Sequence, residues 1–68
     1  MNSIAKTIEV NAASSRSLED AIQGGLRKVA DTIDNIQGAW VGDIKVRTAP
    51  NGDITEWHAR LRVTFIVD

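Results

Sequence analysis

Few side chains in the sequence could carry out catalysis. The chain has no cysteine and one histidine, His58, so it has no thiol nucleophile, and its lone imidazole does not indicate a zinc cluster. Ser14, His58 and Asp53 could form a hydrolytic triad on paper, but the GxSxG motif of a nucleophile elbow is missing. Asp31 and Asp34 are expected to be ordinary surface charges of a helix. We therefore predict that the protein is not an enzyme.

The aromatic side chains are better candidates for binding a ligand. Trp40, Trp57 and Phe65 are the only aromatic residues, and the last two belong to an apolar row that is expected to lie in the core. Val41 has the stronger claim to the core side of its strand, so its neighbour Trp40 is expected on the opposite face. An indole in that position can stack on a planar aromatic ligand, or it can fill an interface between chains.

Polar side chains are expected on the same face as Trp40. His58 could contact the edge of a bound heterocycle, with one ring nitrogen as donor and the other as acceptor, or it could be a solvated or interface histidine. One histidine from each of three chains around a threefold axis could also bind a metal ion. Arg60 and Arg62 could hold an anion.

These side chains must be positioned by a strand and a helix in the first half of the chain. β-branched residues over 4–11 predict a strand, and the small, polar residues over 11–17 predict a loop. Ser17 is a candidate helix cap, with acidic residues after it. The spacing of the apolar residues predicts a helix over 18–36. That apolar stripe consists of Leu18, Ile22, Leu26, Val29, Ile33 and Ile36.

The second half of the chain predicts a β-hairpin. Residues 39–48 form a strand pattern that changes phase around Gly42, where a β-bulge would fit. The dipeptide Asn51-Gly52 is a strong signal for a hairpin turn. Over 54–67, an apolar row faces a row of mostly polar residues at alternating positions, which predicts a strand with one buried face. Its apolar row is Trp57, Ala59, Leu61, Val63, Phe65 and Val67.

Two adjacent glycines, Gly24 and Gly25, lie inside the predicted helix. Each costs up to about 1 kcal/mol relative to alanine in a helix interior. The GxGxxG spacing of a phosphate-binding turn is missing. We therefore predict that both glycines allow close packing of the helix on a sheet or on another helix.

The expected order of elements is β-α-β-β, which predicts one α+β domain over residues 1–68. One helix can cover one face of a three-stranded antiparallel sheet, and the other face then stays bare. A chain of 68 residues buries only about 60% of its unfolded surface, and this one has no disulfide to add stability. We therefore expect copies of the chain to associate through the sheet.

The charge balance and the short apolar runs argue against two classes of partner. Eight lysines and arginines are balanced by nine acidic residues, whereas a nucleic-acid-binding domain is usually strongly basic. The longest apolar runs, such as 65–67, are far shorter than the roughly 20 residues that span a bilayer. No signal peptide pattern occurs in residues 1–6. We expect a cytoplasmic protein without a nucleic-acid or membrane partner.

The sequence resembles the dodecin family over essentially its whole length. The resemblance is carried by the segment Asp20-Ala21-Ile22-Gln23-Gly24-Gly25-Leu26, by the β-α-β-β order and by the closing segment 57–65. It implies a three-stranded sheet wrapped around one helix, with twelve copies forming a hollow sphere. It also implies a store or buffer rather than an enzyme, with pairs of flavins held between tryptophans across twofold axes.

The resemblance also shows departures at the expected ligand site. The position of the flavin-stacking tryptophan falls on Gly38, that of a family glutamate on Trp40, and that of the flavin-contacting glutamine on His58. In one hypothesis, Trp40 stacks on a flavin (riboflavin, FMN or FAD) about 7 Å further along the same face, near His58, Gly38 and Arg60. In the alternative, the homododecameric shell has lost flavin and is structural, or binds another ligand, an anion or a metal ion.

Overall fold

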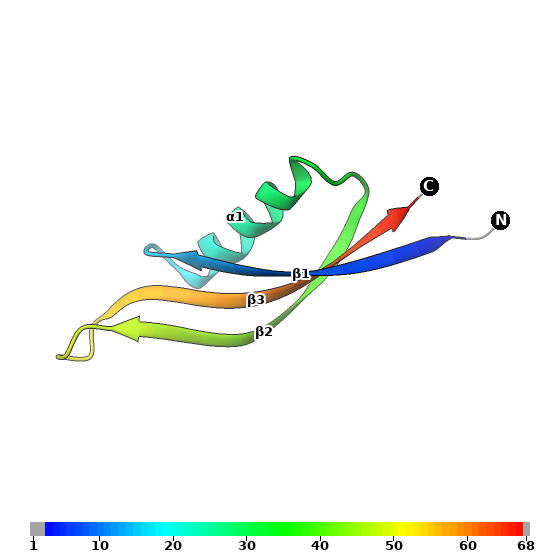
Figure 1. The fold of residues 1–68 in the computed structure, drawn as a ribbon. Helices are drawn as coiled ribbons and strands as arrows, with labels where there is room; N and C mark the ends of the chain where they lie inside the picture. Colours follow the sequence, from blue (N-terminus) through cyan, green and yellow to red (C-terminus); the bar gives the residue numbers. More distant parts are fainter. Residues whose placement is uncertain (1–2, 68) are drawn as a thin grey trace.

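The computed structural model describes residues 3–67, so the ends of the predicted 1–68 domain lie outside the described residues. Its elements are β1 (Ile4–Ser14), α1 (Leu18–Ala30), β2 (Ile36–Thr48) and β3 (Ile54–Val67). The three strands form one antiparallel sheet in the order β1-β3-β2, with α1 on one side of it (Figure 1). The predicted fold class is confirmed.

Two predicted boundaries in the first half of the chain were wrong. Residues 11–14 belong to β1 and not to a loop, because the long strand β3 continues to pair with them as far as Ser14 and Trp57. The helix ends at Ala30 and not at residue 36. Ile36 extends the apolar stripe, but it pairs with Phe65 as the first residue of β2, so that β2 begins three residues earlier than predicted.

The start of the helix was predicted correctly. Ser17 is the N-cap, and its hydroxyl accepts a hydrogen bond from the backbone N–H of Asp20 at 2.9 Å. Glu19 and Asp20 lie in the first turn, and basic residues lie in the last, as the helix dipole favours.

The core lies between α1 and the sheet. Leu61 and Val63 of β3 are fully buried, and Ala59 is nearly so. The helix packs against β1 and β3, which leaves Val41, Ile44 and Val46 on the helix side of β2 exposed. The prediction that all of the apolar row on β3 is core was therefore too broad: Trp57 and Phe65 are half-buried and Val67 is exposed. The residues packed around this centre are Ile8, Val10, Ala12, Leu18, Ile22, Leu26, Val29, Ile36 and Ala39.

The two helix glycines have different surroundings. A Cβ atom on Gly25 would lie 3.0 Å from the Cβ of Ala12 and 3.0 Å from a methyl carbon of Leu61, whereas a Cβ on Gly24 would meet nothing within 4 Å. The predicted close packing of the helix on the sheet is therefore confirmed for Gly25. Gly24 makes no such approach to the sheet, and its packing on another helix stays a prediction.

The predicted β-bulge is present and changes the phase of β2. The register with β3 shifts between the pairs Gly42–Arg60 and Lys45–His58, and Asp43 has a positive φ of 47°. Because of the extra residue, Trp40 and Lys45 lie on the same side of the sheet although their numbers differ by an odd count. The predicted turn is also present, with Gly52 at a φ of 93°.

Candidate ligand-binding face

One face of the sheet points away from α1, and we call it the open face (Figure 1). Each strand contributes alternate residues to it. The four sequence-predicted site residues, Gly38, Trp40, His58 and Arg60, all lie on this face. The other members used below are Thr7 and Glu9 from β1, Gly42, Asp43, Lys45 and Arg47 from β2, and Glu56, Arg62 and Thr64 from β3.

Trp40 is a large, exposed aromatic side chain on the open face. It is 76% exposed and lies directly across from Arg62. Its nearest same-face neighbours along β2 are Gly38 and Gly42, and a Cβ on either would meet nothing within 4 Å. The indole is therefore flanked on both sides by backbone that carries no side chain. This arrangement leaves room for a planar group beside or over the indole.

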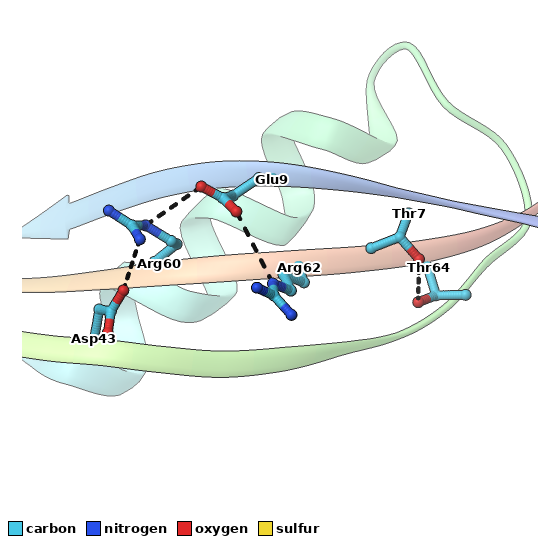
Figure 2. Close-up of polar contacts among 6 residues, drawn as sticks. All are labelled: Thr7, Glu9, Asp43, Arg60, Arg62 and Thr64. Atoms are coloured by element: carbon cyan, nitrogen blue, oxygen red, sulfur yellow. Dashed lines mark hydrogen bonds and ion pairs between the residues drawn. The ribbon is translucent and has the colours of Figure 1, made fainter.

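Arg60 links all three strands on the open face (Figure 2). Its Nη1 donates a hydrogen bond to Oδ2 of Asp43 at 2.7 Å, and its Nε lies 3.4 Å from Oε1 of Glu9. The first contact reaches the bulge of β2, and the second reaches β1. Arg60 therefore has carboxylate partners on both sides.

Arg62, two residues further along β3, is held more loosely. Its Nε lies 3.9 Å from Oε2 of Glu9, and its side chain is 68% exposed (Figure 2). On the far side of Arg62 from Arg60, the hydroxyls of Thr7 and Thr64 are 3.3 Å apart. The surroundings of Trp40 thus contain a guanidinium with one distant partner and a pair of hydroxyl groups.

Trp40 and Arg62 together line two shallow hollows of the open face. One has a volume of about 250 Å³ and includes Gly42, Asp43 and Arg60. The other, of about 480 Å³, includes Thr7 and Glu9. The flavin hypothesis requires space next to an exposed aromatic ring and polar groups at the rim, and the residues present around Trp40 fit that requirement.

His58 lies in another part of the open face. It pairs with Lys45 in the register and lies four residues from Arg62 along β3, a separation of about 13 Å in an extended strand. With Arg60 it lines a separate hollow of about 400 Å³. Its Nε2 contacts Oε1 of Glu56. Within one chain, Trp40 and His58 therefore share the face but are not adjacent.

Sequence reasoning missed the two carboxylates that organise this face. Glu9 could have been found, because the alternation around Ile8 and Val10 places it on the polar side of β1. Asp43 could not be assigned to a face from the pattern alone, since its side depends on the position of the bulge.

Within residues 3–67, histidine and acidic side chains do not gather in threes as a metal site would require. No helix in this part of the chain is long and apolar enough to cross a membrane.

Comparisons with known proteins agree with the fold. The dodecin family model matches residues 4–68. Among solved structures, an arginine-to-alanine mutant of the dodecin from Thermus thermophilus is similar, with a TM-score of 0.90, 25% identity and 98% coverage of both chains. The dodecin from Streptomyces davaonensis has a TM-score of 0.89 at 20% identity and covers 100% of this chain and 98% of its own.

A third similar structure is the calcium dodecin of Mycobacterium tuberculosis, described as having a novel calcium-binding site. Its TM-score is 0.79 at 25% identity, with 96% of this chain and 91% of that chain covered. A comparison with curated protein sequences returned no match. Since the family model spans nearly the whole sequence, this chain belongs to the dodecin family of non-catalytic, small-molecule-binding proteins.

Proposed function

We propose that the protein binds and stores a flavin (riboflavin, FMN or FAD) at the subunit interfaces of a homododecamer, with the isoalloxazine ring stacked on Trp40. The observation that carries this proposal is the 76% exposure of the Trp40 indole on the open face. Exposed tryptophan of this kind is typical of a binding surface, because stacking on an aromatic ring buries area that water otherwise contacts.

The other predicted site residues support this placement in different ways. Gly38 adds no side chain beside the indole, so a ring can extend along β2 from Trp40. Arg60 connects the bulge of β2 to β1 through its two carboxylate partners, Asp43 and Glu9. His58 is assigned to the distal part of a ligand that extends from Trp40 across Arg60, since His58 and Arg60 line a common hollow.

Assembly into a shell is part of the proposal. The dodecin family implies a homo-oligomer. The helix-side residues Val41, Ile44 and Val46 of β2 are exposed, and burying them against another copy would remove apolar surface from water. Copies related by twofold axes would bring two Trp40 indoles toward each other, so that each could cover a bound flavin. A cytoplasmic location belongs to the same proposal.

Flavin titration of the purified assembly tests the proposal. Riboflavin fluorescence is expected to be quenched on binding to the parent protein, because stacking on an indole offers the excited flavin a quenching partner. Trp40→Ala should lose most of the quenching and weaken binding by at least about tenfold, a loss of about 1.4 kcal/mol.

Trp57→Phe is the matched control. Trp57 lies on the helix side of β3, so this variant removes an indole without touching the open face. It should bind riboflavin as the parent does. Equal binding by Trp40→Ala and the parent would contradict stacking on Trp40. Absence of flavin binding together with stabilisation by Ca²⁺ or by inorganic phosphate would support the alternative of a shell that carries another ligand.

A further inference from the structure

We infer that Asn51 is a site of spontaneous deamidation at the tip of the β2–β3 hairpin, and that Asp53 sets the rate of this reaction in the folded protein. The group that reacts is the side-chain amide of Asn51, and the co-reactant is water. The proposed function makes no use of this turn, so flavin binding and the modification are tested independently of each other.

Asn51 is the only asparagine in the sequence that precedes a glycine. Deamidation begins when the backbone nitrogen of the next residue attacks Cγ of the asparagine. Glycine has no Cβ to shield that nitrogen, whereas Asn11 and Asn35 are followed by alanine and isoleucine. Asn51 and Gly52 are both exposed, so water and base reach them. Asn51 is therefore the asparagine best suited to the reaction.

The reaction balances without an oxidant or a reductant. A bond forms between the Gly52 nitrogen and Cγ of Asn51, and the bond between Cγ and Nδ2 breaks. Ammonia leaves with the proton that the Gly52 nitrogen loses, and a cyclic succinimide remains. One water molecule then opens the ring at one of its carbonyl carbons. The product is aspartate or isoaspartate, depending on which carbonyl is attacked.

In the folded hairpin, both reacting groups are held by other partners. The Gly52 N–H donates a hydrogen bond to the Ala49 carbonyl at 2.9 Å. Oδ1 of Asn51 accepts a hydrogen bond from the Asp53 N–H at 3.0 Å, and its Nδ2 donates one to Oδ2 of Asp53 at 3.1 Å. Attack on Cγ requires the amide to turn and the Gly52 nitrogen to become free, so these hydrogen bonds slow the reaction.

Isoaspartate does not fit this turn. The Ala49 N–H donates to the Asp53 carbonyl at 2.8 Å and closes a loop of residues 50–52. A loop of this length depends on a residue in the left-handed region, which here is Gly52 at a φ of 93°. Isoaspartate routes the main chain through the former side chain and adds a methylene group to the loop. The modification therefore loosens the hairpin tip.

Incubation of the purified assembly in mildly alkaline buffer tests the site, because base removes the proton of the attacking nitrogen. Peptide mapping by mass spectrometry measures the loss of amide at each asparagine. Asn51 is expected to react faster than Asn11 and Asn35. The chain unfolded in guanidinium chloride should lose the Asn51 amide at least about tenfold faster than the folded protein, since the hydrogen bonds that hold the amide and Gly52 are then absent.

Two substitutions of Asp53 test its role. Asp53→Ala removes the carboxylate that holds Nδ2 but keeps the backbone N–H, and it is expected to raise the rate at Asn51 in the folded protein by about fivefold. Asp53→Asn keeps an oxygen acceptor for Nδ2 and should react at the rate of the parent. In guanidinium chloride all three proteins should react at the same rate, which separates the folded contact from any effect of local sequence.

Asn51→Gln is the control for the site, because glutamine would have to close a larger ring and should keep its amide. Faster loss of amide at Asn11 or Asn35, or none at Asn51 in either state, would overturn the assignment of the site. Equal rates for the folded and unfolded chain, or an unchanged rate in folded Asp53→Ala, would overturn the control of the reaction by the turn.

Discussion

Asp43 combines two properties that a residue in a strand rarely needs together. Its φ of 47° lies in the left-handed region, which aspartate tolerates better than most residues other than glycine. Its carboxylate accepts a hydrogen bond from Arg60 at 2.7 Å. The bulge therefore places a negative charge on the open face at the point where the phase of β2 changes.

Replacing Asp43 should show both effects. Asp43→Ala is expected to lower the free energy of unfolding by about 1–2 kcal/mol, since alanine is disfavoured in the left-handed region and the exposed ion pair adds about 1 kcal/mol or less. Asp43→Asn keeps the tolerance for positive φ and should cost less than Asp43→Ala. Urea denaturation followed by circular dichroism measures both values. Equal stability of Asp43→Ala and the parent would show that the bulge is not strained.

The helix and the sheet meet closely at one place, where Gly25 faces Ala12 and Leu61. The neighbouring Gly24 makes no such approach, although the two residues look equivalent in the sequence. The packing of α1 on β1 and β3 therefore depends on the absence of one side chain and not of two.

Two alanine substitutions separate these glycines. Gly25→Ala is expected to destabilise the fold, because overpacking costs about 1–3 kcal/mol and outweighs the gain of up to about 1 kcal/mol in helix propensity. Gly24→Ala should stabilise it by up to about 1 kcal/mol, since its Cβ has free space. The melting temperatures of the two variants should move in opposite directions. A loss of stability in Gly24→Ala would indicate that this surface is covered in the assembled protein.

The whole molecule is long and thin, with extents of 56 × 20 × 13 Å. One helix of 13 residues cannot cover a sheet of that length. The helix side of β2 consequently exposes Val41, Ile44 and Val46. Ile54, at the start of β3, is exposed as well. An apolar surface of this kind is expected to lie between copies of the chain.

A charge placed in that surface should weaken assembly. Ile44 is 53% exposed, so Ile44→Asp should be tolerated by the fold of one chain but should disfavour its burial against another copy. Light scattering should give twelve times the mass of one chain for the parent and a smaller mass for the variant. Gln23→Asp adds the same charge on the exposed side of α1 and should leave the mass unchanged. An unchanged mass for Ile44→Asp would place the interface elsewhere.

The sequence by itself determined the features that depend on local spacing. Alternation within 54–67 predicted β3 and its two faces, the Ser17 cap predicted the start of α1, and the change of phase near Gly42 predicted the bulge. Together these patterns placed Trp40 on the face away from the helix. Such features follow from backbone geometry over a few residues, with periods of 2 and 3.6.

Only the tertiary structure decided what depends on contacts between distant residues. The helix ends at Ala30 because Ile36 is taken into β2 by pairing with Phe65, although its spacing continues the helical stripe. Gly24 and Gly25 differ through a single approach to β1 and β3. Arg60 and Arg62 have the same residue type, strand and face, and only the positions of Glu9 and Asp43 make one of them a structural link and the other an available cation.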